Sequence, residues 1–219
     1  MLGKQVFRYT SLLIGAYMGI GVLLHYVIFP EASPDMSSYP SAGDSVGDSS
    51  SAERFVFRTT TRETEGERFT FDFFLRPGAK VPTEHVHSIQ EERFEVLEGT
   101  LTVTLASEEI LLQPGDVAVV PPGVAHQAFN RGETEAHALV DVRPSGNLDM
   151  FFVQLERSGV SMEPPGAQAG LQFARFMQEY EASYSAGMPI VAQKALAFLV
   201  APTARLLGYR NYYAERGDR

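Results

Sequence analysis

The sequence predicts an all-β domain, a jelly-roll sandwich or barrel, with an apolar helix before it and a helical pair after it. Between residues 55 and 155, short stretches alternate apolar and polar residues, and Gly, Pro or Asn bounds most of them. Many short strands at this spacing are typical of jelly rolls. The expected strands include 69–75, 92–97, 101–105, 109–112, 117–120, 126–130 and 136–142.

Composition limits the classes of function. With 219 residues, 44% of them hydrophobic, the chain can bury the core of one globular domain. Its net charge of −9 argues against nucleic acid as a partner, because phosphate backbones attract basic surfaces. The absence of cysteine excludes disulfides, thiol catalysis and zinc–thiolate sites. Any bound metal must therefore be held by imidazole and carboxylate groups.

Residues 1–30 are predicted to form a membrane anchor. The run 11–29 contains one ionisable residue, His25, and its 19 residues would extend roughly 29 Å as a helix, close to the thickness of a bilayer core. Alternatives are a cleaved signal peptide and a buried core helix. Lys4 and Arg8 precede the run and acidic residues follow it, so we expect a single-pass protein with its folded domain outside the cytoplasm.

Residues 31–53 are rich in Ser, Asp, Gly and Pro and contain almost no large apolar residues. Such a segment buries too little surface to offset the entropy lost on ordering. We therefore expect a flexible linker that connects the anchor to a barrel over residues 54–160.

Residues 161–219 are predicted to form a helical extension. After Pro164 the apolar period becomes helical, and one stripe continues to Tyr184 before Gly187 and Pro189 end it. A second, largely apolar helix is expected over 190–207. We expect this pair to pack on the barrel or on a second subunit of a homodimer, with a membrane-surface role as the alternative.

Three of the five histidines fall in two linked patterns. These are Gly78-x6-His85-x-His87-x4-Glu92-x6-Gly99 and Gly115-x5-Pro121-x-Gly123-x2-His126-x3-Asn130. Residues two apart on a strand point to the same face, so His85 and His87 are expected to project together. Glu92 from the next strand and His126 from a later one would complete a set of three imidazoles and one carboxylate. This set suits one divalent ion of Fe, Mn, Ni, Cu or Zn and leaves coordination positions open.

These two patterns resemble the two motifs of the cupin superfamily, and the chain is similar to a single-domain cupin with a type-2 barrel. The second motif matches at every fixed position, whereas the first has six rather than five residues between Gly78 and His85. The resemblance covers about half of the chain, roughly residues 69–142. It implies that His85, His87, Glu92 and His126 are the metal ligands.

Other residues are weaker candidates for the site. Glu91 is an alternative ligand, but Glu92 keeps the six-residue spacing to Gly99. Glu95 and Glu98 are candidate bases or solvated outer residues. His137 is expected to be either exposed at the surface or packed among other side chains. The aromatic residues that are expected either to line the pocket or to fill the core are Phe71, Phe73 and Phe94.

Three functions are compatible with these features. The first is a metal-dependent oxidoreductase, a dioxygenase of the quercetinase-like kind that acts on a small oxygen-rich substrate. The second is a membrane-tethered module that binds or senses a small molecule without turnover. The third is a structural protein whose metal braces the barrel. The complete ligand set favours the first two.

Overall fold

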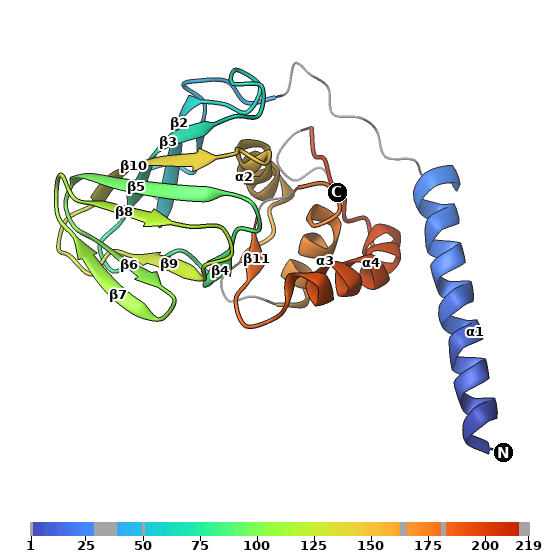
Figure 1. Ribbon diagram of the computed structural model, residues 1–219. Coiled ribbons are helices and arrows are strands. Elements are labelled where there is room, and N and C mark those ends of the chain that lie inside the picture. The colour runs from blue at the N-terminus through green and yellow to red at the C-terminus, as the bar shows by residue number, and fades with distance from the viewer. Residues whose placement is uncertain (1, 29–38, 50, 163–165, 181–182, 215–219) are drawn as a thin grey trace.

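The computed structural model describes residues 2–28, 39–49, 51–162, 166–180 and 183–214 and contains two antiparallel sheets that form a jelly roll (Figure 1). One sheet has the strand order β1-β2-β3-β10-β5-β8, and the other has the order β11-β4-β9-β6-β7. The strands are β1 Ser45–Val46, β2 Glu53–Thr59, β3 Phe69–Leu75, β4 His85–Val86, β5 Glu91–Glu98, β6 Leu101–Leu105, β7 Glu108–Leu112, β8 Val117–Val120, β9 His126–Phe129, β10 Ala136–Arg143 and β11 Tyr184–Ser185.

The alternation of side chains explains why these strands form and which face is buried. In β5, Glu92, Phe94 and Val96 point inward and are buried, whereas Arg93 and Glu95 point outward. β3 is buried on both faces, because its inward phenylalanines lie in the core and Asp72 on its outer face is covered by neighbouring side chains. The predicted jelly roll and its strands from 69 to 142 are thus present.

Ordered structure begins before the predicted boundary at residue 54. β1 lies in the segment expected to be a linker, and its Val46 is buried in the core. Backbone hydrogen bonds join Gly43 N to Phe57 O at 2.8 Å and Phe57 N to Asp44 O at 2.9 Å. This two-residue edge strand was not predicted because the segment is polar and only one apolar residue, Val46, anchors the strand in the core. Linker residues 31–38 lie outside the described part of the chain.

A helix also lies in the stretch predicted as barrel. α2, Leu148–Ser158, places Leu148, Phe151, Phe152 and Leu155 on one stripe that packs against the barrel core. Gly159, with φ of 61°, ends it in the left-handed conformation. The consecutive strands of the barrel therefore end at Arg143, and α2 covers one end of the barrel (Figure 1).

The predicted helical pair is present, but its first helix is shorter than expected. α3, Ala167–Phe176, ends eight residues before Tyr184, and α4, Ile190–Leu206, packs against it. The prediction that the first helix continues to Tyr184 is wrong, because Tyr184 forms β11 and pairs with Val86 of β4. Pairing with β4 thus determines the conformation of Tyr184, although the local sequence favours a helix.

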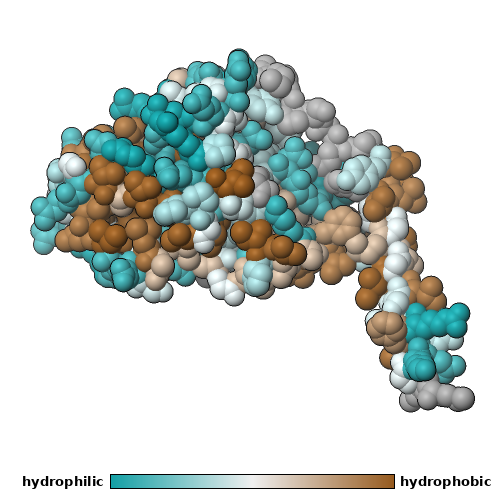
Figure 2. All heavy atoms as spheres, in the orientation of Figure 1, coloured by the Kyte–Doolittle hydropathy of each residue, from teal (hydrophilic) through white to brown (hydrophobic). Residues whose placement is uncertain are grey.

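The N-terminal segment forms one long apolar helix, α1 Leu2–Leu23 followed by the π-helical turn η1 Leu24–Ile28. Gly3–Ile28 is long and apolar enough to cross a membrane, and only 6% of its most apolar window is buried. Figure 2 shows hydrophobic residues along most of α1 and hydrophilic residues near its free end. Low burial argues against a core helix, whereas a signal sequence satisfies the same length and composition. The His25 side chain is outside the described part of the structure.

Candidate metal centre

The two sheets bring the four predicted ligands to one point. His85 of β4 and His126 of β9 are register partners in the five-stranded sheet, and His87 follows β4 directly. Glu92 comes from β5 of the opposite sheet. One ligand atom from each of these four residues lies within 4.8 Å of all the others. The cluster therefore has the three imidazoles and one carboxylate that the sequence predicts.

Backbone carbonyl groups orient two of the imidazole rings. His85 Nδ1 lies 3.0 Å from Thr83 O, and His126 Nδ1 lies 3.1 Å from Val124 O. An Nδ1–H group that donates to a carbonyl oxygen leaves a lone pair on Nε2. This is the arrangement by which metal-binding histidines are held in place in proteins.

The distances between ligand atoms fit a shared ion. Glu92 Oε2 lies 2.9 Å from His126 Nε2 and 3.4 Å from His87 Nε2. Two atoms that each lie about 2.1 Å from one ion are about 3.0 Å apart along an octahedral edge and about 3.4 Å apart along a tetrahedral edge. With His126 Nδ1 beside Val124 O, either a proton on Nε2 or a metal ion can bridge His126 Nε2 and Glu92 Oε2. The residues present therefore fit a divalent metal ion.

Electrostatics put two of the ligands in the protonation states that metal binding requires. Burial, together with the neighbouring His126 and His87, lowers the pKa of His85 to about 3. Burial alone would raise the pKa of Glu92, but its contacts with His126 and His87 outweigh burial and hold that pKa well below its usual range. Near neutral pH, His85 is a neutral imidazole and Glu92 is a carboxylate, so neither needs to lose a proton to bind a metal.

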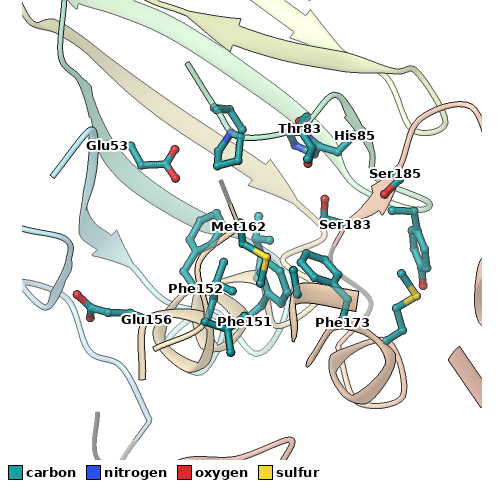
Figure 3. Close-up of a pocket in the computed structure, with 18 of the residues that line it drawn as sticks. Glu53, Thr83, His85, Phe151, Phe152, Glu156, Met162, Phe173, Ser183 and Ser185 are labelled. Atoms are coloured by element: carbon teal, nitrogen blue, oxygen red, sulfur yellow. The ribbon is translucent and has the colours of Figure 1, made fainter. Parts of the chain in front are cut away.

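The cluster opens into a large cavity, which Figure 3 shows in close-up. All four residues of the cluster line this cavity; His87, Glu92 and His126 are buried, whereas His85 is half-buried. In Figure 3, His85 and Thr83 lie on one side of the cavity, and Phe151, Phe152 and Phe173 lie across from them. A molecule in the cavity can therefore approach the cluster from the His85 side.

The structure also places the weaker candidates. Glu91 is exposed and points away from the cluster, so Glu92 is the carboxylate of the set. Glu95 lies on the outer face with its carboxylate 2.8 Å from Arg93, and Glu98 is exposed, so neither reaches the cavity. His137 lies outside the barrel, where its Nε2 is 2.9 Å from Asp72 Oδ1 and its ring stacks on Phe74.

Phe71, Phe73 and Phe94 combine both roles that the sequence left open, because they are buried in the core and line the cavity. The cavity residues that the helices contribute were not predicted from the sequence. Phe151 and Phe152 of α2 and Phe173 of α3 form the wall opposite the cluster. The apolar stripe of residues 148–155 was the available signal, but it lay inside the stretch predicted as barrel.

Part of this chain is similar to known proteins. Residues 71–142 match the family model described as "Cupin domain". The chain is 33% identical over 70 residues to the tetracenomycin polyketide synthase protein TcmJ of Streptomyces glaucescens, which covers 32% of this chain and 46% of that protein. It is 31% identical over 99 residues to quercetin 2,3-dioxygenase of Bacillus subtilis (strain 168), covering 45% of this chain and 29% of the relative. A predicted oxalate decarboxylase from Thermotoga maritima aligns with a TM-score of 0.40 and 19% identity, covering 42% of this chain and 80% of that structure.

The chain thus contains a cupin domain, which is a type of jelly-roll domain, within residues 71–142. The four clustered residues all lie inside that stretch. The chain spans less than half the length of either curated relative. The N-terminal helix and the C-terminal helices lie outside the part that the family model covers.

Proposed function

We propose that the protein is a metal-dependent oxidoreductase, a dioxygenase of the quercetinase-like kind that acts on an oxygen-rich substrate. The observation that carries this proposal is the half-buried His85 edge of an otherwise buried ligand cluster. A site that only braced the barrel would have no need of a face open to a cavity. The 31% identity to quercetin 2,3-dioxygenase supports the same class of reaction.

In this proposal His85, His87, Glu92 and His126 hold one divalent ion, and the cavity supplies the substrate beside it. The ion would provide open positions for chelation by the substrate and for O2. The reaction balances when both atoms of O2 enter the substrate and the substrate supplies the four electrons. The phenylalanines that line the cavity would orient the substrate and exclude water from the reacting atoms.

We also propose that the run 11–29 anchors the protein in a membrane with the cupin domain outside the cytoplasm. The helix has the length and composition of a span, and Lys4 and Arg8 lie near its N-terminal end. Basic residues favour the cytoplasmic side, which supports this orientation.

The test is O2 consumption by the full chain in detergent micelles. The protein is loaded separately with Fe, Mn, Ni, Cu or Zn and offered flavonols, catechols, diketones and oxidised sugars. We expect O2 uptake with a redox-active metal and none with Zn, which has no redox chemistry. Tight binding of a panel member without O2 uptake under any metal would overturn the proposed dioxygenase activity. It would show instead that the domain is a small-molecule binding module.

A further inference from the structure

The cavity at the metal cluster is larger than a small oxygen-rich molecule requires. Its volume is about 1150 Å³, whereas pockets for drug-sized ligands range over about 300–1,000 Å³. It extends from His85 past Phe152 of α2 and Met162 to Phe173 of α3 (Figure 3). The barrel alone does not form this space, because α2, α3 and α4 all contribute to its wall.

One stripe of α4 faces the cavity. Gln193, Leu196, Ala197 and Val200 line it and follow the i, i+3, i+4, i+7 spacing of a single helical face. Leu196 is 52% exposed, although it belongs to this stripe. The apolar wall of the cavity therefore reaches the molecular surface along α4.

The charges of the lining disfavour an anionic ligand. No lysine or arginine stands among the described residues that line the cavity. Three carboxylate residues do line it: Glu92 of the ligand cluster, and Glu53 and Glu156, which both lie on one side in Figure 3. A fatty acid or a phosphorylated molecule would find acidic neighbours and no cation except the metal itself. The lining suits a neutral, largely apolar molecule.

The other face of α4 contacts the candidate membrane helix. Tyr17 of α1 donates its hydroxyl to Leu199 O and lies 3.2 Å from Thr203 Oγ1. Gly21 lies so close to Pro202 that an added Cβ would be 2.6 Å from Pro202 Cγ. These residues of α4 lie outside the cavity stripe, so α4 separates the cavity from α1.

This position places α4 alongside the candidate membrane helix. Its contacts lie about 10 Å along the axis from Ile28 at Gly21 and about 16 Å from it at Tyr17. α4 also exposes apolar side chains away from the cavity, with Val191 80%, Phe198 43% and Leu206 66% exposed. Lipid is the partner that matches such a face beside a membrane span.

We propose that the cavity binds a neutral lipophilic molecule that enters from the membrane past α4. Its oxygen-bearing head would lie at the four clustered ligand residues. An apolar tail longer than a simple ring would lie between α2, α3 and α4. The position of the head rests on the proposed function, whereas the tail site depends only on the cavity. An alkyl catechol, with two neighbouring oxygens and a hydrocarbon chain, is the probe of this class.

The experiment is photolabelling of the full chain in phosphatidylcholine nanodiscs. The probe is 4-dodecylcatechol with a photoreactive diazirine at the end of its tail. We expect saturable labelling of peptides from α3 and the cavity stripe of α4. Unmodified 4-dodecylcatechol should protect these peptides, whereas 4-methylcatechol and dodecanoate at the same concentration should not.

Gly170 of α3 offers a matched pair of variants. It lines the cavity at an exposed position, and a Cβ built on it meets nothing within 4 Å, so Gly170→Phe can add a ring at the cavity wall without straining the helix. Gln168→Phe adds the same ring at an exposed position of α3 that does not line the cavity. We expect Gly170→Phe to reduce protected labelling by at least about tenfold and Gln168→Phe to leave it unchanged. Unchanged metal content would show that the Gly170→Phe cupin domain is folded, and Leu196→Glu, at an exposed position, is the second blocking variant.

Labelling confined to α1 and the lipid-facing side of α4, without protection, would overturn the inference. Unaltered labelling in both Gly170→Phe and Leu196→Glu would overturn it as well. The result is independent of turnover. Protected labelling without O2 uptake would support the lipophile site and overturn the proposed dioxygenase activity. O2 uptake with 4-methylcatechol but no protected labelling would support the dioxygenase activity and overturn the lipophile site.

Discussion

Glu92 and His126 lie on opposite sheets of the jelly roll, 34 residues apart in sequence, with Oε2 of one 2.9 Å from Nε2 of the other. Both side chains are buried. Their contact joins the two sheets at the point where His85 and His87 converge. A carboxylate beside imidazole lone pairs is costly to bury unless a cation is shared between them. The relationship between these two residues is therefore the structural basis for the proposed metal site.

Glu91 and Glu92 provide a matched pair for testing the carboxylate ligand. They are adjacent in β5 but point to opposite sides of the sheet. Glu92→Gln should weaken metal binding by more than about 100-fold, the upper end of what loss of an outer-shell partner costs. Glu91→Gln should bind as the wild type does. Titration of the metal-free chain with Co(II) or Zn(II), followed by calorimetry, measures both. Equal metal affinities for the two variants would show that Glu92 is not a ligand.

The outer face of β3 predicts acid sensitivity that is separate from the metal site. Burial would raise the pKa of Asp72, but hydrogen bonds from Arg58, at 2.5 and 3.0 Å, and from His137 outweigh it and lower that pKa. A carboxyl group with a lowered pKa stabilises the fold above its unfolded pKa, and this contribution is lost as the pH falls through the folded value. Asp72→Asn should therefore lower the free energy of unfolding at pH 7 by about 1–3 kcal/mol.

The difference between Asp72→Asn and the wild type should shrink below about pH 3.9, where the unfolded Asp side chain takes up its proton. Urea unfolding followed by circular dichroism at several pH values measures this difference. The control is Glu98→Gln, at an exposed position of the same sheet, which should follow the wild type throughout. A difference that stays constant down to acid pH would show that Asp72 acts through its shape rather than its charge.

Two glycines of the first motif are both left-handed but differ in their surroundings. Gly78 has φ of 76° with nothing within 4 Å of an added Cβ, whereas Gly99 has φ of 70° and its Cβ would lie 2.5 Å from Glu135 O. Gly78→Ala should cost about 1–2 kcal/mol of stability from the left-handed backbone alone. Gly99→Ala should cost clearly more, because the β5–β6 turn must move away from the backbone at Glu135. Urea unfolding measures the stability of both variants, and the urea midpoint should be lower for Gly99→Ala than for Gly78→Ala. Identical midpoints would contradict this prediction.

The absence of cysteine allows a direct test of membrane orientation. Gln5→Cys lies in the N-terminal helix and Glu133→Cys lies in the turn before β10, and both positions are exposed. A membrane-impermeant maleimide added to intact spheroplasts should label Glu133→Cys but not Gln5→Cys until the membrane is broken. The reverse pattern would contradict the proposed orientation. An N-terminally trimmed, soluble protein would identify the helix as a signal sequence.

The barrel and the cluster could be predicted because their signals are local and redundant. The alternation in 69–75 and 136–142 specifies strands, and the spacing of His85, His87, Glu92 and His126 identifies a shared site without knowledge of the turns between them. Turn glycines such as Gly99 mark the hairpins because a side chain there would meet backbone atoms.

The helical wall of the cavity could not be predicted, because its signals are weak or depend on distant contacts. Tyr184 fits a helical stripe in sequence, yet it pairs with Val86 nearly one hundred residues earlier in the chain. Val46 is the single buried residue of a two-residue strand within a polar segment. Neither pairing leaves a periodic pattern, so only the folded chain identifies them.

The central claim is that the four clustered side chains hold one divalent metal ion. Elemental analysis of the full chain, purified without chelators and in parallel with His126→Ala, tests it most directly. We expect one transition-metal ion per wild-type chain and loss of most of it in His126→Ala, with the circular dichroism of the folded barrel retained. A wild-type chain that contains no stoichiometric metal, and takes up none from added Fe, Mn, Ni, Cu or Zn, would show that these side chains do not form a metal site.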